Sequence, residues 1–365
     1  MILLFKKSIL VFLCFGILTR TLGQANHGRT ENIVIVTMDG MRWQEVFGGV
    51  DTAILNNPAY TRDKDGLTKR FGSEDVLTKR GKLFPFFWST IASKGQLYGN
   101  RTTGNYVNVA NPYHFSYPGY NEIFTGYPDT AVNSNDKILN KNTNVLEFIN
   151  RQKGYTGKVA VFSTWDVFPY ILNRGRSGIY VNSDVDTLRF TSPGLKVVNE
   201  MQFLAPRPLD VRPDLLTYFA GKEYLEAYAP RVLYIAFDET DDFAHAGLYD
   251  QYLNSAHAED AMIGDLWNML QTLPRYKDKT TLIVTCDHGR GDKIKDQWKD
   301  HGEKIEGSDA IWLAVIGPDT PPSGEARTSG QLYQKQWAPT MAALLGFDFH
   351  PDHGASEPVT SVFTK

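Results

Sequence analysis

Four short apolar runs recur along the chain, and each leads directly into polar residues. The runs, each with the polar residue that follows, are 32–38 before Asp39, 158–162 before Ser163, 231–237 before Asp238 and 281–286 before Asp287. A fifth run covers 310–316 and ends at Gly317. Runs this short, apolar throughout and rich in β-branched residues, predict strands buried on both faces, as in a mainly parallel sheet.

Helical patterns lie between these runs. Asn254 or Ser255 can cap a helix whose apolar residues recur on one face, and a second helix is predicted from 331 to 345, stopped by Gly346. Strands that alternate with helices predict a layered α/β/α domain. Its functional groups are expected at the carboxyl ends of the strands, where the polar residues lie.

Two segments interrupt the alternation. Residues 51–82 are polar and turn-rich, and residues 166–230 form a long aromatic stretch with several prolines. We predict a single catalytic domain over 24–365 in which both segments are insertions over the site.

The first 23 residues resemble a secretory signal. Lys6 and Lys7 precede a short apolar run, and Thr21 to Gly23 supply a small-residue cleavage site. The run is short for a bilayer span, so a retained anchor is the weaker interpretation. We therefore expect an exported protein, periplasmic or extracellular, without stable membrane insertion.

The charge balance restricts the class of binding partner, and the cysteine content restricts the possible disulfide bonds. Removing 1–23 takes three of the 38 basic residues and no acid, which leaves 35 basic against 41 acidic residues and a net charge of −6. That balance disfavours a nucleic acid polymer as partner. Cys286 is the one cysteine outside the signal, so no intrachain disulfide is expected, and it is interpreted as a small core residue.

The acids and histidines near the strand ends form two candidate metal-binding sets. They are Asp39, Asp287 and His288 in one set, and Asp241, His245 and His301 in the other. Carboxylates mixed with imidazoles suit zinc or a similar divalent ion better than calcium or magnesium. Asp238 and Asp242 compete with Asp241, and only the four-residue spacing to His245 favours Asp241.

Six segments in this order resemble the alkaline phosphatase superfamily, within it the phosphodiesterase/nucleotide pyrophosphatase-like branch. The segments are IVIVTMDGMRW (33–43), FSYPGYNEIFTG (115–126), DDFAH (241–245), TCDHGRGD (285–292), HGEKIEGSDAIWLAVIGP (301–318) and QWAPTMAALLG (336–346). Together they extend over nearly the whole chain outside the signal.

The resemblance implies a nucleophile and two metal ions, with zinc expected. Ser116 would be the nucleophile and would share one zinc with Asp39, Asp287 and His288, while the remaining three ligands would hold the other. A serine hydroxyl is a weak nucleophile that a nearby dication activates. The expected reaction is a double displacement, in which a phosphoserine forms and water then hydrolyses it.

The sequence indicates the groups that bind the phosphoryl oxygens less clearly than it indicates the metal ligands. Asn135 is our choice by analogy with the branch, with Asn133 and Asn121 left open. Arg290 follows the Asp-His pair closely enough to reach the substrate, although an exposed loop arginine is the equal alternative. His114 is interpreted as structural.

The expected activity is hydrolysis of a phosphodiester or pyrophosphate bond in a small phosphoester, such as a nucleotide. A phosphomonoesterase on the same site is the main alternative. A sulfatase of this superfamily would need an arginine where this chain has Tyr120, and a catalytically silent metal-binding protein would be expected to lack one of these residues.

Overall fold

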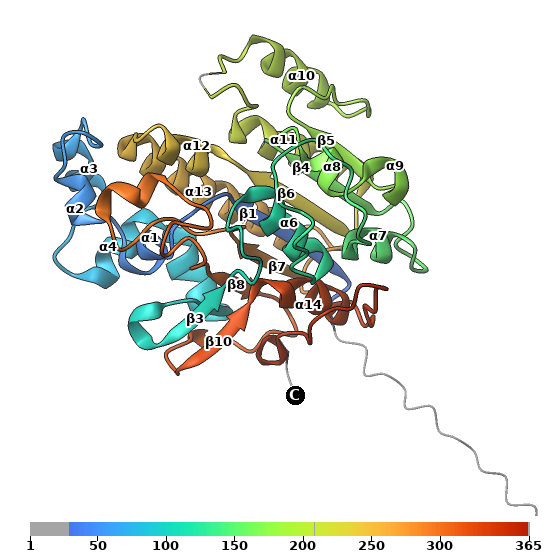
Figure 1. The fold of residues 1–365 in the computed structure, drawn as a ribbon. Coiled ribbons are helices and arrows are strands. Elements are labelled where there is room, and N and C mark those ends of the chain that lie inside the picture. Colours follow the sequence, from blue (N-terminus) through green and yellow to red (C-terminus); the bar gives the residue numbers. More distant parts are fainter. Residues whose placement is uncertain (1–28, 208, 364–365) are drawn as a thin grey trace, which may run out of the picture.

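The computed structural model describes residues 29–207 and 209–363, so the predicted signal of residues 1–23 lies outside the described part. Its centre is an eight-stranded sheet (Figure 1). In spatial order the strands are β5 (Tyr180–Ser183), β4 (Val159–Ser163), β6 (Val232–Phe237), β1 (Asn32–Met38), β7 (Thr280–Thr285), β8 (Leu313–Ile316), β2 (Gln96–Tyr98) and β9 (Gly324–Glu325).

The sheet is parallel from β5 to β7. The strand β1 lies at its centre, paired in parallel with β6 on one side and β7 on the other. β8 runs antiparallel to both β7 and β2, and β9 is parallel to β2. Every residue of β1, β4, β6, β7 and β8 is buried, as expected for strands covered on both faces. The predicted mainly parallel sheet is therefore confirmed.

Helices cover both faces of this sheet (Figure 1). On one face α11 contacts β4 and β6, and α13 contacts β1. On the other, α6, α7 and α14 contact one another, and α7 contacts β4. The α-helices are α1 (Trp43–Gly48), α2 (Thr52–Leu55), α3 (Lys64–Phe71), α4 (Val76–Leu83), α5 (Ala92–Lys94), α6 (Ser116–Thr125), α7 (Val145–Asn150), α8 (Phe168–Ile171), α9 (Arg174–Ser177), α10 (Leu195–Leu204), α11 (Asp214–Tyr228), α12 (Glu239–His245), α13 (Tyr249–Thr272) and α14 (Trp337–Leu344).

The shorter elements complete the chain. Two strands, β3 (Asn105–Asn108) and β10 (Gly330–Tyr333), form a separate parallel pair. The remaining short helices are η1 (Phe87–Ile91), η2 (Arg101–Thr103), η3 (Lys295–Lys299), η4 (Gln334–Gln336) and η5 (Thr360–Val362). In the described part of the chain, no helix combines the length and the apolarity that crossing a membrane requires.

Two predicted helix boundaries are wrong. The helix expected over 331–345 begins only at Trp337, because the residues before η4 pair with β3 as a strand. The helix expected to start at Asn254 or Ser255 begins at Tyr249, so neither residue is its cap. The two predicted insertions also contain regular structure: α2 to α4 in the first, and α8 to α11 with β5 in the second.

Candidate active site

Three neighbouring strands deliver most of the predicted site residues to one edge of the sheet. Asp39 follows β1, and its backbone N–H donates to Phe237 O at the end of β6. Asp241 and His245 lie on α12, which begins two residues after β6. Asp287 and His288 follow β7 after a single residue. Because the ends of parallel strands meet at one edge, side chains far apart in sequence converge there.

The nucleophile candidate and the last histidine arrive from outside the parallel strands. Ser116 is the first residue of α6, is buried, and has its Oγ 3.4 Å from His288 Nε2. His301 follows η3 in the connection between β7 and β8. Its ring stacks on that of His288 with the centroids 3.9 Å apart.

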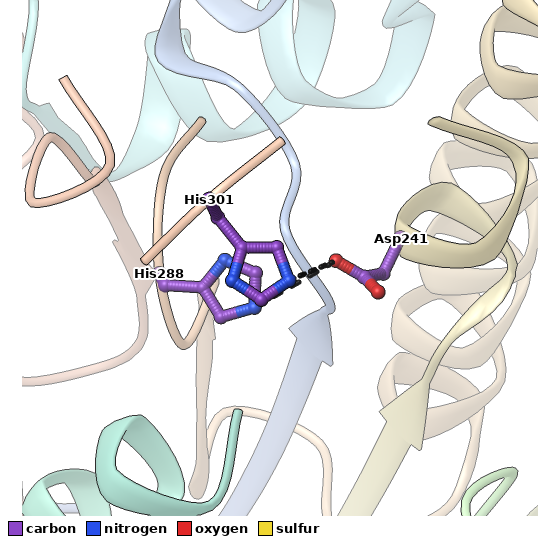
Figure 2. A group of neighbouring side chains, drawn as sticks. All are labelled: Asp241, His288 and His301. Atoms are coloured by element: carbon purple, nitrogen blue, oxygen red, sulfur yellow. Dashed lines mark ion pairs between the residues drawn. The ribbon is translucent and has the colours of Figure 1, made fainter. Parts of the chain in front are cut away.

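The ligand atoms fall into two groups that share His288. One group is Asp39, Asp287 and His288, and the other is Asp241, His288 and His301 (Figure 2). In each group the ligand atoms lie within 4.8 Å of one another. His245 joins the second group, because its Nε2 lies 3.1 Å from Asp241 Oδ2 and 2.8 Å from His301 Nε2. The structure thus brings together all seven residues proposed as metal ligands.

Asp241, and neither of its acidic neighbours, faces the histidines. Its carboxylate lies within 3.7 Å of the Nε2 atoms of His288 and His301. Asp238 instead immediately precedes α12, and its backbone N–H donates to the Asp214 carboxylate. Asp242 has one buried oxygen without a hydrogen-bond partner among the described residues. Unlike Asp241, it forms no ion pair with His288 or His301 in the described structure.

The donor atoms of this site fit divalent cations. His288 Nδ1 and His301 Nδ1 each lie within hydrogen-bond distance of a backbone carbonyl, so both must carry a hydrogen, and in the neutral rings each Nε2 is a bare lone pair. Those lone pairs face carboxylate oxygens and another imidazole, which are also acceptors. Asp39 Oδ1 and Asp287 Oδ2 are buried and have no hydrogen-bond partner within the described part of the chain. A divalent cation would satisfy all of these atoms at once.

The surroundings shift the pKa values of the three candidate carboxyl ligands in different directions. Burial raises the pKa of Asp39 well above its usual range, and the charge of Asp241 adds to the increase. Burial likewise raises the pKa of Asp287, with a further contribution from Asp39. For Asp241 burial acts in the same direction, but the Arg290 guanidinium and His245 outweigh it and bring the pKa well below the usual range. Bound dications would stabilise the ionised forms of all three groups.

Arg290 is held by contacts within the protein. Its guanidinium is buried and donates to Gly40 O, Lys299 O and Asp241 O, and it forms an ion pair with the Asp241 carboxylate. These contacts occupy the group inside the protein. Arg290 thus contacts a candidate ligand, Asp241, and is not the exposed loop arginine that was the alternative, while its contact with substrate stays a prediction.

Of the three asparagines considered, Asn135 lies beside the nucleophile. Its Oδ1 accepts the backbone N–H of Tyr117, the residue after Ser116. Asn121 is fully buried and its amide bonds to Tyr127, Asn140 and Asn142 within the protein. Asn133 lines a cavity of about 150 Å³ bordered by Tyr117 and Ile138.

Two further residues contact the site and carry no obvious sequence signal. Tyr120 donates from its hydroxyl to Asp39 Oδ2 at 2.8 Å. Gly40 donates its backbone N–H to Asp287 Oδ1, and a Cβ there would lie 2.6 Å from Asp241 Oδ1. Gly40 also has φ +56°, so both its conformation and its surroundings require glycine.

Comparisons with known proteins identify the family. Residues 50–311 match the model of type I phosphodiesterase / nucleotide pyrophosphatase. No curated protein matches the sequence.

Solved structures of several hydrolases share the fold. The alkaline phosphatase PafA superposes with a TM-score of 0.63 at 11% identity, covering 93% of this chain and 99% of that one. The phosphonate monoester hydrolase of Agrobacterium radiobacter gives 0.55 at 13% identity, covering 91% and 77%. A 2-O GAG sulfatase gives 0.55 at 14% identity, covering 91% and 74%. The chain therefore belongs to the type I phosphodiesterase / nucleotide pyrophosphatase family and has the fold of the alkaline phosphatase superfamily, a group of phosphoester and sulfate ester hydrolases.

Proposed function

We propose that this protein is an exported phosphodiesterase or pyrophosphatase that acts on small phosphoesters, such as nucleotides, with Ser116 as its nucleophile. The observation that carries the proposal is the position of Ser116 Oγ, 3.4 Å from His288 Nε2, an atom that also lies 3.4 Å from Asp39 Oδ1 and 3.4 Å from Asp287 Oδ2. The Ser116 hydroxyl therefore lies beside His288, a ligand of the ion that is expected to activate it.

Seven residues would hold two divalent ions, with zinc favoured by the donors. Asp39, Ser116, Asp287 and His288 would hold one ion, and Asp241, His245 and His301 the other. When bound, such ions would favour the alkoxide of Ser116 and neutralise charge on the phosphoryl oxygens.

The residues of the chain then perform two displacements. Ser116 Oγ attacks phosphorus, a P–Oγ bond forms, and the bond from phosphorus to the leaving oxygen breaks. In the second step water attacks phosphorus and the P–Oγ bond breaks. A proton from that water returns to Ser116 Oγ, and the phosphorus-containing product is released. Ser116 lies at the N-terminus of α6, where the helix dipole favours a negatively charged group. We propose that Asn135 donates from its Nδ2 to a non-bridging oxygen, since its Oδ1 is already held by Tyr117 N.

The arginines favour a diester over a monoester. A monoester carries one more negative charge on its non-bridging oxygens, which a nearby cationic side chain would neutralise. Arg290 is occupied inside the protein, Arg176 bonds to Glu147 and to backbone carbonyls, and Arg174 pairs with Asp186. Arg290 is buried and Arg176 is held by several bonds, which favours the less charged diester, whereas Arg174 keeps a half-exposed side chain in its ion pair.

The test compares bis(p-nitrophenyl) phosphate, p-nitrophenyl phosphate and p-nitrophenyl sulfate with zinc-loaded enzyme. We expect the diester to be cleaved fastest, and Ser116→Ala to lose roughly 10³-fold or more of that rate. The metal content of Ser116→Ala, measured by mass spectrometry, checks that the remaining ligands still bind. A variant with wild-type turnover would reject Ser116 as nucleophile, and fastest cleavage of the sulfate would reject the substrate class.

Export is tested separately. Fractionation of cells that express the full chain should place the protein outside the cytoplasm, with residues 1–23 removed. A full-length cytoplasmic product would contradict the signal.

A further inference from the structure

His114 has an uncommon backbone conformation beside the nucleophile. It lies two residues before Ser116 and has φ +52°, in the left-handed region. For a residue with a side chain this region is disfavoured, because the Cβ comes too close to the following carbonyl oxygen. Such a conformation persists only where surrounding contacts hold it.

Hydrogen bonds from the nucleophile helix hold this turn. Glu122, which lies on α6 with Ser116, accepts both the backbone N–H of Asn111 and its side-chain amide, at 2.8 and 3.0 Å. Asn111 Oδ1 in turn accepts the backbone N–H groups of Tyr113 and His114, each at 3.1 Å. Asparagine commonly stabilises a turn in this way.

The turn directs one carbonyl at a candidate metal ligand. His114 O lies 3.2 Å from His301 Nδ1 and accepts its hydrogen. That bond places the proton of the neutral His301 ring on Nδ1 and leaves Nε2 bare, facing Asp241 and His245. Partners of this kind fix both the tautomer and the ring orientation of a metal-binding histidine.

We propose that His114 is a positioning residue that acts through its main chain: the left-handed turn 111–114 holds His301 in its metal-binding orientation. The turn thereby couples the helix that carries the nucleophile to a ligand of the other ion. The inference rests on the proposed metal site, and it assigns no role to the imidazole of His114.

Substitutions at His114 separate the main chain from the side chain. His114→Gly and His114→Asn remove the imidazole but adopt positive φ readily, whereas His114→Val strongly disfavours it. We expect the glycine and asparagine variants to bind two zinc ions with affinities within about 3-fold of the wild type. The valine variant should bind one of the two ions roughly 10–100-fold more weakly, in competition titrations against a chromophoric chelator.

A double-mutant comparison tests whether the effect passes through His301. If His114→Val acts by misorienting His301, it should add little to the zinc-affinity loss of His301→Ala. Should the valine variant fail to fold, nitrogen NMR of zinc-free wild type still tests the contact. The His301 ring, assigned by its disappearance in His301→Ala, should then be in the Nδ1–H form.

Each outcome has a definite meaning. Wild-type affinity in His114→Val, loss of zinc in His114→Asn, or an Nε2–H tautomer of His301 would overturn the inference. Wild-type protein that binds fewer than two zinc ions would instead reject the proposed function.

Discussion

The hydroxyl of Tyr120 donates a hydrogen bond to Asp39 Oδ2 at 2.8 Å, between the helix of the nucleophile and the end of the central strand. Both groups are buried. The bond occupies one oxygen of Asp39 and leaves Oδ1, which has no hydrogen-bond partner, directed at His288. Tyr120 therefore orients a candidate ligand. The same residue occupies the position where a sulfatase of this superfamily would need an arginine.

Removing the Tyr120 hydroxyl should reduce zinc affinity more than it reduces the free energy of unfolding. We expect Tyr120→Phe to lower the affinity for one zinc ion by about 10–100-fold, because partners of ligands orient them. Chelator competition measures the affinity. Tyr117→Phe is the matched control, since it removes a buried hydroxyl from the same helix that donates to Ile138 O and not to a ligand. Equal zinc affinities in the two variants would contradict the role of Tyr120.

Close contact between α6 and the strand end at β7 gives a second prediction. A Cβ on Gly119 would lie 2.4 Å from the backbone oxygen of Asp287, so Gly119→Ala must displace the helix or the ligand pair. We expect a loss of about 2–4 kcal/mol in the free energy of unfolding, typical of overpacking a buried contact. Urea denaturation measures this loss.

Gly81 provides the control for that experiment. It lies within α4, and a Cβ there meets nothing within 4 Å. Gly81→Ala should be neutral or stabilise the protein by up to about 1 kcal/mol. If Gly119→Ala behaved like Gly81→Ala, α6 would not be packed as closely on Asp287 as the structure indicates.

The parts predictable from sequence were those with strong local signals. β1 was expected at 32–38 and has those boundaries, because a continuous apolar run followed by Asp-Gly defines both its burial and its end. The ligand candidates could be identified because acids and histidines at strand ends are chemically distinctive. Sequence spacing alone favoured Asp241 over Asp238, and the structure shows Asp241 among the histidines.

The remaining parts depend on long-range contacts. Residues 330–333 form a strand because β3, more than two hundred residues earlier, supplies its hydrogen bonds. The position of Arg290 after the Asp-His pair suggests a substrate ligand, and only the fold reveals the backbone carbonyls that accept from its guanidinium. The roles of Tyr120 and His114 depend on a hydrogen-bond direction and a backbone angle, which residue type alone does not specify.

A buried amide supports the strand end that carries Asp287 and His288. Gln334 donates from Nε2 to Cys286 O at 3.1 Å and to Asp287 O at 2.7 Å. Gln334→Leu keeps a buried side chain of similar size and leaves both carbonyls without this donor. We expect a loss of roughly 1–3 kcal/mol in stability, because unpaired buried polar groups are costly, together with weaker zinc binding.

Gln336 offers the comparison for Gln334. It lies two residues along in η4, and its amide bonds to Tyr333 and Glu357 at the surface. Gln336→Leu should change stability by less than about 1 kcal/mol and leave zinc affinity unchanged. Equal effects of the two substitutions, measured by urea denaturation and zinc titration, would argue against a specific support of Asp287.

A buried carboxyl group on α13 should make stability depend on pH. Glu259 is fully buried, and neither of its oxygens has a hydrogen-bond partner among the residues that the structure describes. Burial raises its pKa well above the usual 4.5, and the charges of Asp214 and Glu239 add to the increase. The folded protein therefore keeps this proton at pH values where the unfolded chain has lost it. Stability falls as pH rises above about 4.5, by at most ~1.4 kcal/mol per pH unit from this group.

Glu259→Gln removes this ionisable group, so the stability it gains over the wild type should increase as the pH rises. In metal-stripped protein we expect little difference at pH 4 and a gain of roughly 1–3 kcal/mol at pH 8, measured by urea denaturation. Asp260→Asn is the contrast, because Asp260 accepts the backbone N–H groups of Phe86 and Phe87 and an amide nitrogen would oppose one of them, so this variant should be less stable than the wild type at pH 4. Burial raises the pKa of Asp260 to about 7, so this loss should become smaller as the pH rises toward 7. A gain for Glu259→Gln that is equal at both pH values would show that the ionisation of Glu259 is not what destabilises the fold.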